Sequence, residues 1–78
     1  MSHQPLTELM PLERIHTVAP DMSKTHKKIA EYILENYESA SFLTSVALAQ
    51  KCSVSESSVI RFSMALGYSG FTEMQRAL

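Results

Sequence analysis

A short polar segment of the chain, from Lys51 to Arg61, carries side chains of the kinds that bind nucleic acid. The guanidinium of Arg61 can donate two hydrogen bonds to O6 and N7 of a guanine, and the ammonium of Lys51 can contact a phosphate. Ser57 and Ser58 lie about one helical turn before Arg61, where small hydroxyls would let a helix lie against base edges. Ser55 is a further candidate DNA contact, although its position favours a helix cap. Alternatively, Arg61 pairs with Glu56, and the two serines are ordinary surface residues.

Three further positions could contact phosphates. Lys24 stands at the start of a predicted helix, together with Lys27 and Lys28, and positive charge there opposes the helix dipole. A bound phosphate would offset that cost, although a solvated charged face explains the lysines equally well. The backbone N–H groups at the helix starts near Ser45 and Ser69 are the other two positions, because helix N-termini attract phosphate.

The sequence contains no set of residues for catalysis or metal binding. Cys52 is the only cysteine, and we expect it to be a small buried residue rather than a nucleophile. His3, His16 and His26 are not spaced three or four residues from one another or from Cys52, which argues against a zinc site. The sequence therefore predicts a binding protein that is not an enzyme and has no cofactor.

The residues of the polar segment have the pattern of a helix-turn-helix, in which two short helices cross at a steep angle. Ala49 is small enough for the crossing point, and Val54 can fill the space beneath the turn. Val59 and Phe62 would face the first helix. Ser53 stands where glycine is common, because the turn favours a positive φ that serine adopts only with some strain. An αα-hairpin without a role in DNA binding would show similar spacing.

Apolar residues recur at helical spacing along most of the chain, and no alternating run of β-branched residues indicates a strand. We predict an all-α bundle of about five helices. Ser23, Ser55 and Ser69 suit the N-caps of three of them, and Gly67 suits the end of one. The predicted segments are helices at 11–18 and 24–36, a short turn or helix at 42–43, and helices at 46–52 (capped by Thr44 or Ser45), at 56–66 and after Ser69. The predicted inward-facing residues include Leu12, Ile15, Ile29, Ile33, Val46, Ala49, Val59, Phe62, Ser63, Leu66, Phe71, Met74 and Leu78.

The composition is that of a soluble domain. The 78 residues suffice for one domain, 45% of them are hydrophobic, and the net charge is −1. A single cysteine suits a reducing compartment, and no apolar run approaches the ~20 residues that span a bilayer. We therefore expect a cytoplasmic domain over residues 11–78, without membrane contact, preceded by a flexible arm over residues 1–10.

The near-neutral charge argues against strong binding of nucleic acid by one copy, since such domains usually carry a basic surface. We therefore predict a homodimer that presents two recognition helices to one DNA site. Contact between the copies would involve apolar residues near the N-terminus, namely Leu6, Leu9, Leu12 and Ile15. A rival interpretation is a helical interaction or dimerisation module without DNA contact, in which Ile60 and Met64 pack on a partner.

Two segments of the chain resemble the amino-terminal domain of RpiR-type (MurR/RpiR) transcriptional regulators. The runs Val54–Phe62 and Leu66–Met74 contain V-S-x-x-S-V-x-R-F and L-G-Y-x-G-F-x-E-M at the spacing of that family. The resemblance implies a homeodomain-like helix-turn-helix and sequence-specific binding of double-stranded DNA by a bacterial regulator of sugar or sugar-phosphate metabolism. It also implies a carboxy-terminal domain, absent from this chain, through which a phosphosugar effector would act. Ser53 and Met64 depart from the family pattern, which has glycine and commonly a basic residue at these positions.

Overall fold

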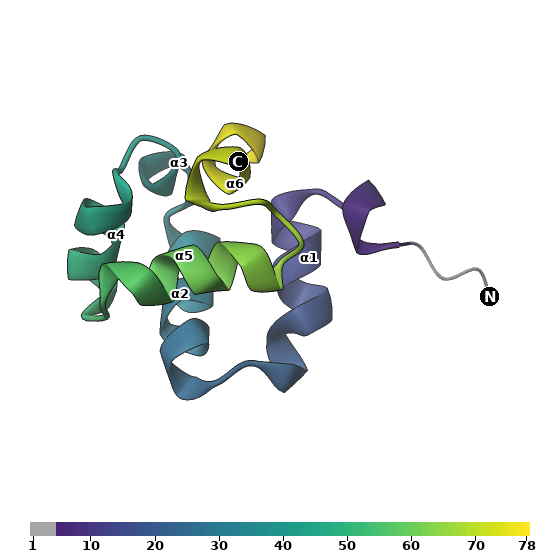
Figure 1. The fold of residues 1–78 in the computed structure, drawn as a ribbon, viewed down its shortest axis with the longest axis horizontal. Helices are drawn as coiled ribbons and strands as arrows, with labels where there is room; N and C mark the ends of the chain where they lie inside the picture. Colours follow the sequence, from purple (N-terminus) through teal and green to yellow (C-terminus); the bar gives the residue numbers. More distant parts are fainter. Residues whose placement is uncertain (1–4) are drawn as a thin grey trace.

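Eight helical segments follow one another along residues 5–78, the part of the chain that the computed structural model describes, and no strand occurs within that part (Figure 1). Six are α-helices and two are short 3₁₀ helices, so the predicted all-α class is confirmed. The bounds are η1 Leu6–Glu8, α1 Pro11–Val18, η2 Ala19–Asp21, α2 Lys24–Glu35, α3 Tyr37–Ala40, α4 Ser45–Cys52, α5 Glu56–Ala65 and α6 Phe71–Ala77. Within the described residues, no helix is long and apolar enough to cross a membrane.

The helices begin at residues that suit helix starts. The hydroxyls of Ser23 and Ser55 each accept a hydrogen bond from a backbone N–H of the first turn, at 3.2 Å, and so cap α2 and α5 as predicted. Thr44 caps α4 in the same way, with its Oγ1 atom 3.1 Å from the Ala47 nitrogen. Pro11 stands in the first turn of α1, where its missing N–H costs nothing.

The core is built around α5, which packs against α2, α4 and α6. Figure 1 shows α5 crossing α2 near the centre of the molecule. Val59, Phe62 and Ser63 are fully buried on one face of α5, and the buried C-cap residue Leu66 continues this face, as their spacing predicts. The buried Ser63 hydroxyl donates to the Val59 carbonyl at 3.0 Å, so its burial leaves no hydrogen bond unmade. Because burying each large apolar side chain stabilises the fold by about 1.5–3 kcal/mol, this face fixes the rotation of α5 about its own axis.

One predicted inward residue of α4 is exposed. Val46 keeps 49% of its surface accessible, whereas Leu48, Ala49 and Cys52 are buried. These three residues form a stripe at i, i+1 and i+4, and at about 100° per residue Val46 falls well outside it. The prediction for Val46 is therefore wrong, because a two-turn helix with apolar residues on several sides is compatible with more than one buried stripe.

The turn between α4 and α5 depends on one residue in the left-handed conformation. Ser53 ends α4 with φ 58° and ψ 44°, and it is the one residue other than glycine with a positive φ among those described. This conformation lets the Val54 N–H donate to the Ala49 carbonyl at 3.0 Å, so the chain reverses within a few residues. The expectation that serine adopts a positive φ here is confirmed. A side chain in this conformation costs roughly 1–2 kcal/mol, which glycine would not incur.

We predict that Ser53→Gly raises the free energy of unfolding by about 0.5–1 kcal/mol. Glycine removes the steric strain, although part of the gain is offset by its greater freedom in the unfolded chain. Ser53→Val should lower stability, because a β-branched residue is strongly disfavoured at positive φ. Thermal unfolding of the three proteins gives the order, and a higher midpoint for the valine variant than for the glycine variant would contradict the explanation.

A buried arginine joins α1 to the end of α5, and no sequence pattern pointed to it. Arg14 is only 7% exposed, and it donates from Nε to the Leu9 carbonyl at 2.9 Å and from Nη1 to the Leu66 carbonyl at 3.0 Å. Its guanidinium carbon lies 4.0 Å from the centre of the Tyr68 ring, which is a cation–π contact. Gly67, beside these groups, has the predicted positive φ, at 90°. These contacts hold the carboxy-terminal end of α5 against α1.

The segment before α1 contacts the helical domain. The sequence predicts a flexible arm over residues 1–10, of which residues 1–4 lie outside the described residues. In the remainder, Leu6–Glu8 form η1, and the Leu9 carbonyl accepts the hydrogen bond from Arg14. At least Leu9 of the predicted arm therefore contacts the helical domain.

Candidate nucleic-acid interface

The helices α4 and α5 form a helix-turn-helix. Three residues connect Cys52, at the end of α4, to Glu56, at the start of α5. The two helices pack against each other, with Ala49 and Val59 buried. At the edge of this pair, the Ser45 hydroxyl donates a hydrogen bond to the Glu56 carboxylate at 2.6 Å. Core burial and this hydrogen bond together fix α5 relative to α4.

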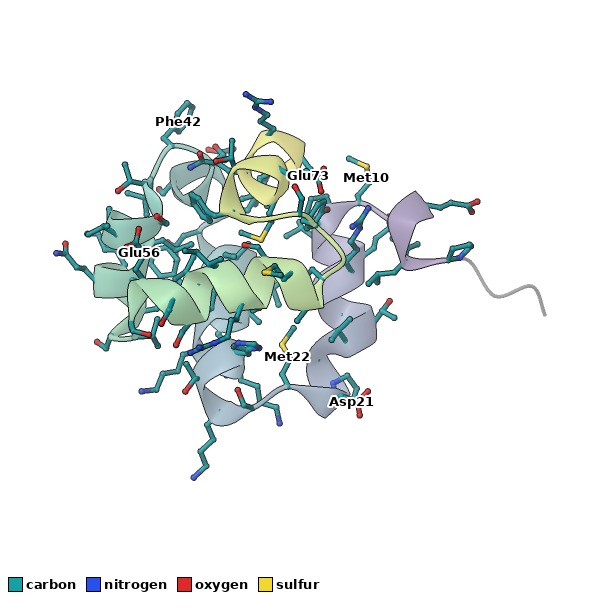
Figure 2. All side chains as sticks on the ribbon, in the orientation of Figure 1. Met10, Asp21, Met22, Phe42, Glu56 and Glu73 are labelled. Carbon is teal, nitrogen blue, oxygen red and sulfur yellow. The ribbon has the colours of Figure 1, made fainter. Side chains whose placement is uncertain are left out.

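Four of the predicted contact residues are exposed around the turn and on α5, and one of them, Ser55, is the N-cap described above. Ser57 and Arg61 lie on the side of α5 that faces away from the core, together with the exposed side chains of Ile60 and Met64. These four residues, spaced i, i+3, i+4 and i+7, are called the outer face of α5 below. Lys51 is exposed in the last turn of α4, immediately before the connecting residues. In Figure 2 no other helix crosses in front of α5, so a partner could approach it from this side.

Two of the predicted serines serve the start of α5 instead. Ser58 is 7% exposed, and its backbone N–H donates to the Ser55 hydroxyl. The hydroxyls of Ser55 and Ser58 also lie 2.8 Å apart, within hydrogen-bond distance. Ser58 is the neighbour of the buried Val59 and lies at the edge of the buried stripe, which turns its hydroxyl inward. The outer face therefore presents Ser57 and not Ser58.

The start of α2 lies beside the middle of α5. The imidazole of His26 meets the Phe62 ring edge-on, with 5.7 Å between ring centroids and 86° between planes. Burial lowers the pKa of His26 below 6.5, and the positive charge of nearby Arg61 lowers it further. The first turn of α2, which also carries the exposed Lys24, is thus a neighbour of Arg61. Sequence reasoning named Lys24 and Arg61 separately but did not bring His26 beside Arg61, because this proximity arises from packing between segments far apart in the chain.

We predict that His26 makes the protein less stable in mild acid. Since folding lowers the pKa of His26, the unfolded chain takes up a proton first, and stability falls as the pH drops below about 6.5. The loss of stability with falling pH ends only below the lowered pKa of His26 in the folded protein. Between about pH 7.5 and pH 5.5, above the range in which carboxylates titrate, His26→Gln should lose less stability than the wild type. Urea unfolding at both pH values measures the difference, and equal losses in the two proteins would refute the prediction.

A carboxylate lies beside each of the two helix starts that were predicted to bind phosphate. The carboxylate of Glu56 accepts the hydrogen bond from Ser45, beside the start of α4. The Ser69 N–H donates to the Glu73 carboxylate at 2.9 Å. The predicted cap at Ser69 is also wrong, because α6 begins one residue later, after Gly70. Ser69 follows the carboxy-terminal end of α5, so the structure places it away from Ser57 and the turn.

The comparisons with known proteins agree with this geometry. The chain matches the model of the helix-turn-helix domain of the rpiR family over residues 10–78. It is 39% identical over 67 residues to the uncharacterized HTH-type transcriptional regulator YfhH of Escherichia coli (strain K12). The aligned residues make up 86% of this chain and 24% of YfhH. It is also 39% identical over 64 residues to the HTH-type transcriptional regulator HexR of Pseudomonas aeruginosa. The aligned residues make up 82% of this chain and 22% of HexR.

The two relatives are much longer than this chain, so the similarity concerns only one part of each. The chain spans about a quarter of the length of the two relatives, and the aligned part is the helical domain described above. The family match includes all six α-helices and the turn at Ser53. This chain therefore belongs to the rpiR family of helix-turn-helix domains.

Proposed function

We propose that this chain binds a specific sequence of double-stranded DNA as the DNA-binding domain of a transcriptional regulator, and that it is not an enzyme. The observation that carries the proposal is the outer face of α5, where Ser57 and Arg61 are exposed opposite a fully buried face. An α-helix fits the major groove, and the first turns of a recognition helix lie nearest the base edges. Membership of the family and the names of the two relatives support the same function.

The proposed contacts differ in kind. Arg61 lies in the second turn of α5 and is the side chain that can donate two hydrogen bonds to a guanine. Ser57, in the first turn, contacts a base or a phosphate, while Ser55 keeps its role as the cap. Lys51, exposed beside the turn, and Lys24, exposed in the first turn of α2, contact phosphates and place the helix in the groove.

The experiment that tests the proposal is retention of genomic DNA fragments by the purified protein in the presence of excess nonspecific competitor. We expect a few fragments with a shared sequence to be enriched. In line with the family resemblance, we propose that these fragments lie beside genes of sugar or sugar-phosphate metabolism, and that a phosphosugar acts through a domain outside this chain. Retention of fragments in proportion to their abundance would contradict sequence-specific binding.

We also propose that the protein acts as a homodimer, which would place two recognition helices about 34–36 Å apart on one face of DNA. An open apolar groove of about 360 Å³, lined in part by Met10, Leu12 and Tyr37, supports contact through the start of α1. Ile15, predicted as a contact residue, is fully buried and belongs to the core instead. Sedimentation should show a dimer that Leu12→Glu weakens. A wild-type protein that stays monomeric at high concentration would contradict the proposal.

A further inference from the structure

The outer face of α5 combines a basic group with two large apolar side chains. Ile60 is 39% exposed and Met64 is 56% exposed, whereas Val59 and Phe62 of the same helix are fully buried. Ile60 is adjacent to Arg61 in sequence and lies three residues after Ser57, so it lies beside the two proposed DNA contacts on the same face. The exposed part of the Ile60 side chain does not contribute to the core.

The major groove offers one apolar group that an isoleucine can recognise. Thymine carries a C5-methyl group at its groove edge, and proteins distinguish it by apolar contact. The other groups at that edge are hydrogen-bond donors and acceptors, and a side chain without polar atoms would leave them unpaired. Ile60 lies in the second turn of α5, within the part of a recognition helix that contacts bases.

The charges around Ile60 favour DNA over a protein surface as the occupant. Arg61 adjoins it in the sequence, and the start of α2, with the exposed lysines Lys24, Lys27 and Lys28, lies on the Arg61 side of α5. The nearest acidic group on α5 is the Glu56 carboxylate, which accepts a hydrogen bond from Ser45. An apolar side chain next to an exposed arginine suits the groove of a polyanion.

We propose that Ile60 is a specificity-determining residue that contacts the methyl group of a thymine next to the base recognised by Arg61. This inference rests on the proposed function and deepens it, because it specifies a thymine beside the guanine in the recognised sequence. Met64, one turn further along the same face, adjoins Ile60 on the side away from the helix start.

The test uses synthetic duplexes of the enriched sequence in which single thymines are replaced by uracil, which lacks only the methyl group. We expect replacement at one thymine of each half-site to weaken binding by the wild-type protein about fourfold, the effect of burying one methyl group. Ile60→Ala should bind the thymine and uracil duplexes equally. Phe42→Ala, which removes an apolar side chain that is 88% exposed and lies away from α5 in Figure 2, is the matched control and should keep the fourfold difference.

The outcomes separate this inference from the proposed function. If the wild type binds the sequence specifically but tolerates uracil at every thymine, the role of Ile60 is wrong while the proposed function stands. If Ile60→Ala keeps full DNA affinity but sediments with a weaker dimer, the face contacts protein and the inference is again wrong. If the wild type binds no sequence preferentially, the proposed function itself fails. The uracil arm leaves the protein unchanged, so it remains decisive even if Ile60→Ala folds poorly.

Discussion

Replacing Phe62 by alanine should cost about 3–5 kcal/mol of stability, which is enough to unfold a domain of this size. Phe62 is fully buried in the middle of α5, and its ring also meets the edge of His26. The alanine variant would lose the transfer free energy of the ring and leave a cavity between α5 and α2. Denaturant unfolding measures the loss directly, and circular dichroism shows whether the helices remain.

Phe42 provides the matched control for this prediction. Its side chain is 88% exposed, so Phe42→Ala should change stability by no more than about 0.5 kcal/mol. If Phe62→Ala left the unfolding midpoint unchanged, α5 could not be oriented with Val59 and Phe62 toward the core. The outer face would then be misassigned, together with every contact proposed for Arg61.

The parts of the fold that the sequence predicted depend on local chemistry. The buried face of α5 follows from the spacing of Val59, Phe62 and Leu66, and the cap at Ser55 follows from its hydroxyl. The left-handed conformation of Ser53 was expected because the turn of a helix-turn-helix favours a positive φ. Each of these features is determined within a few residues of chain.

The parts that the sequence did not predict depend on contacts between distant segments. The burial of Arg14 requires the carbonyl of Leu66, which lies far along the chain. The pKa of His26 depends on Arg61, on another helix. Ser58 faces inward because the buried stripe of α5 is wider than its apolar residues suggest. Spacing alone cannot reveal such contacts, since they depend on which helices pack together.

The second large effect is expected at Arg61. Arg61→Ala should weaken binding to the enriched sequence by about 1–3 kcal/mol and relax the preference at one base pair, because two hydrogen bonds to a guanine are lost. Its side chain is exposed, so stability should change little. Arg76→Ala removes the same charge from an exposed position on α6 and serves as the control, with little change expected in specificity.

Lys51 gives the complementary result if it contacts a phosphate. Lys51→Ala should weaken binding to every sequence alike and should make the dependence of affinity on salt shallower by roughly one unit. It should leave the ratio of specific to nonspecific affinity unchanged. Arg61 and Lys51 therefore separate base recognition from phosphate binding within one helix-turn-helix.

The measurement that tests the central claim most directly is the affinity of wild type, Arg61→Ala and Lys51→Ala for the enriched and scrambled duplexes across a salt series. The structure predicts that Arg61→Ala lowers affinity for the enriched duplex far more than for the scrambled one, whereas Lys51→Ala lowers both equally. Equal losses for Arg61→Ala would make Arg61 a phosphate contact. Unchanged affinity in both folded variants would contradict DNA recognition by the outer face of α5.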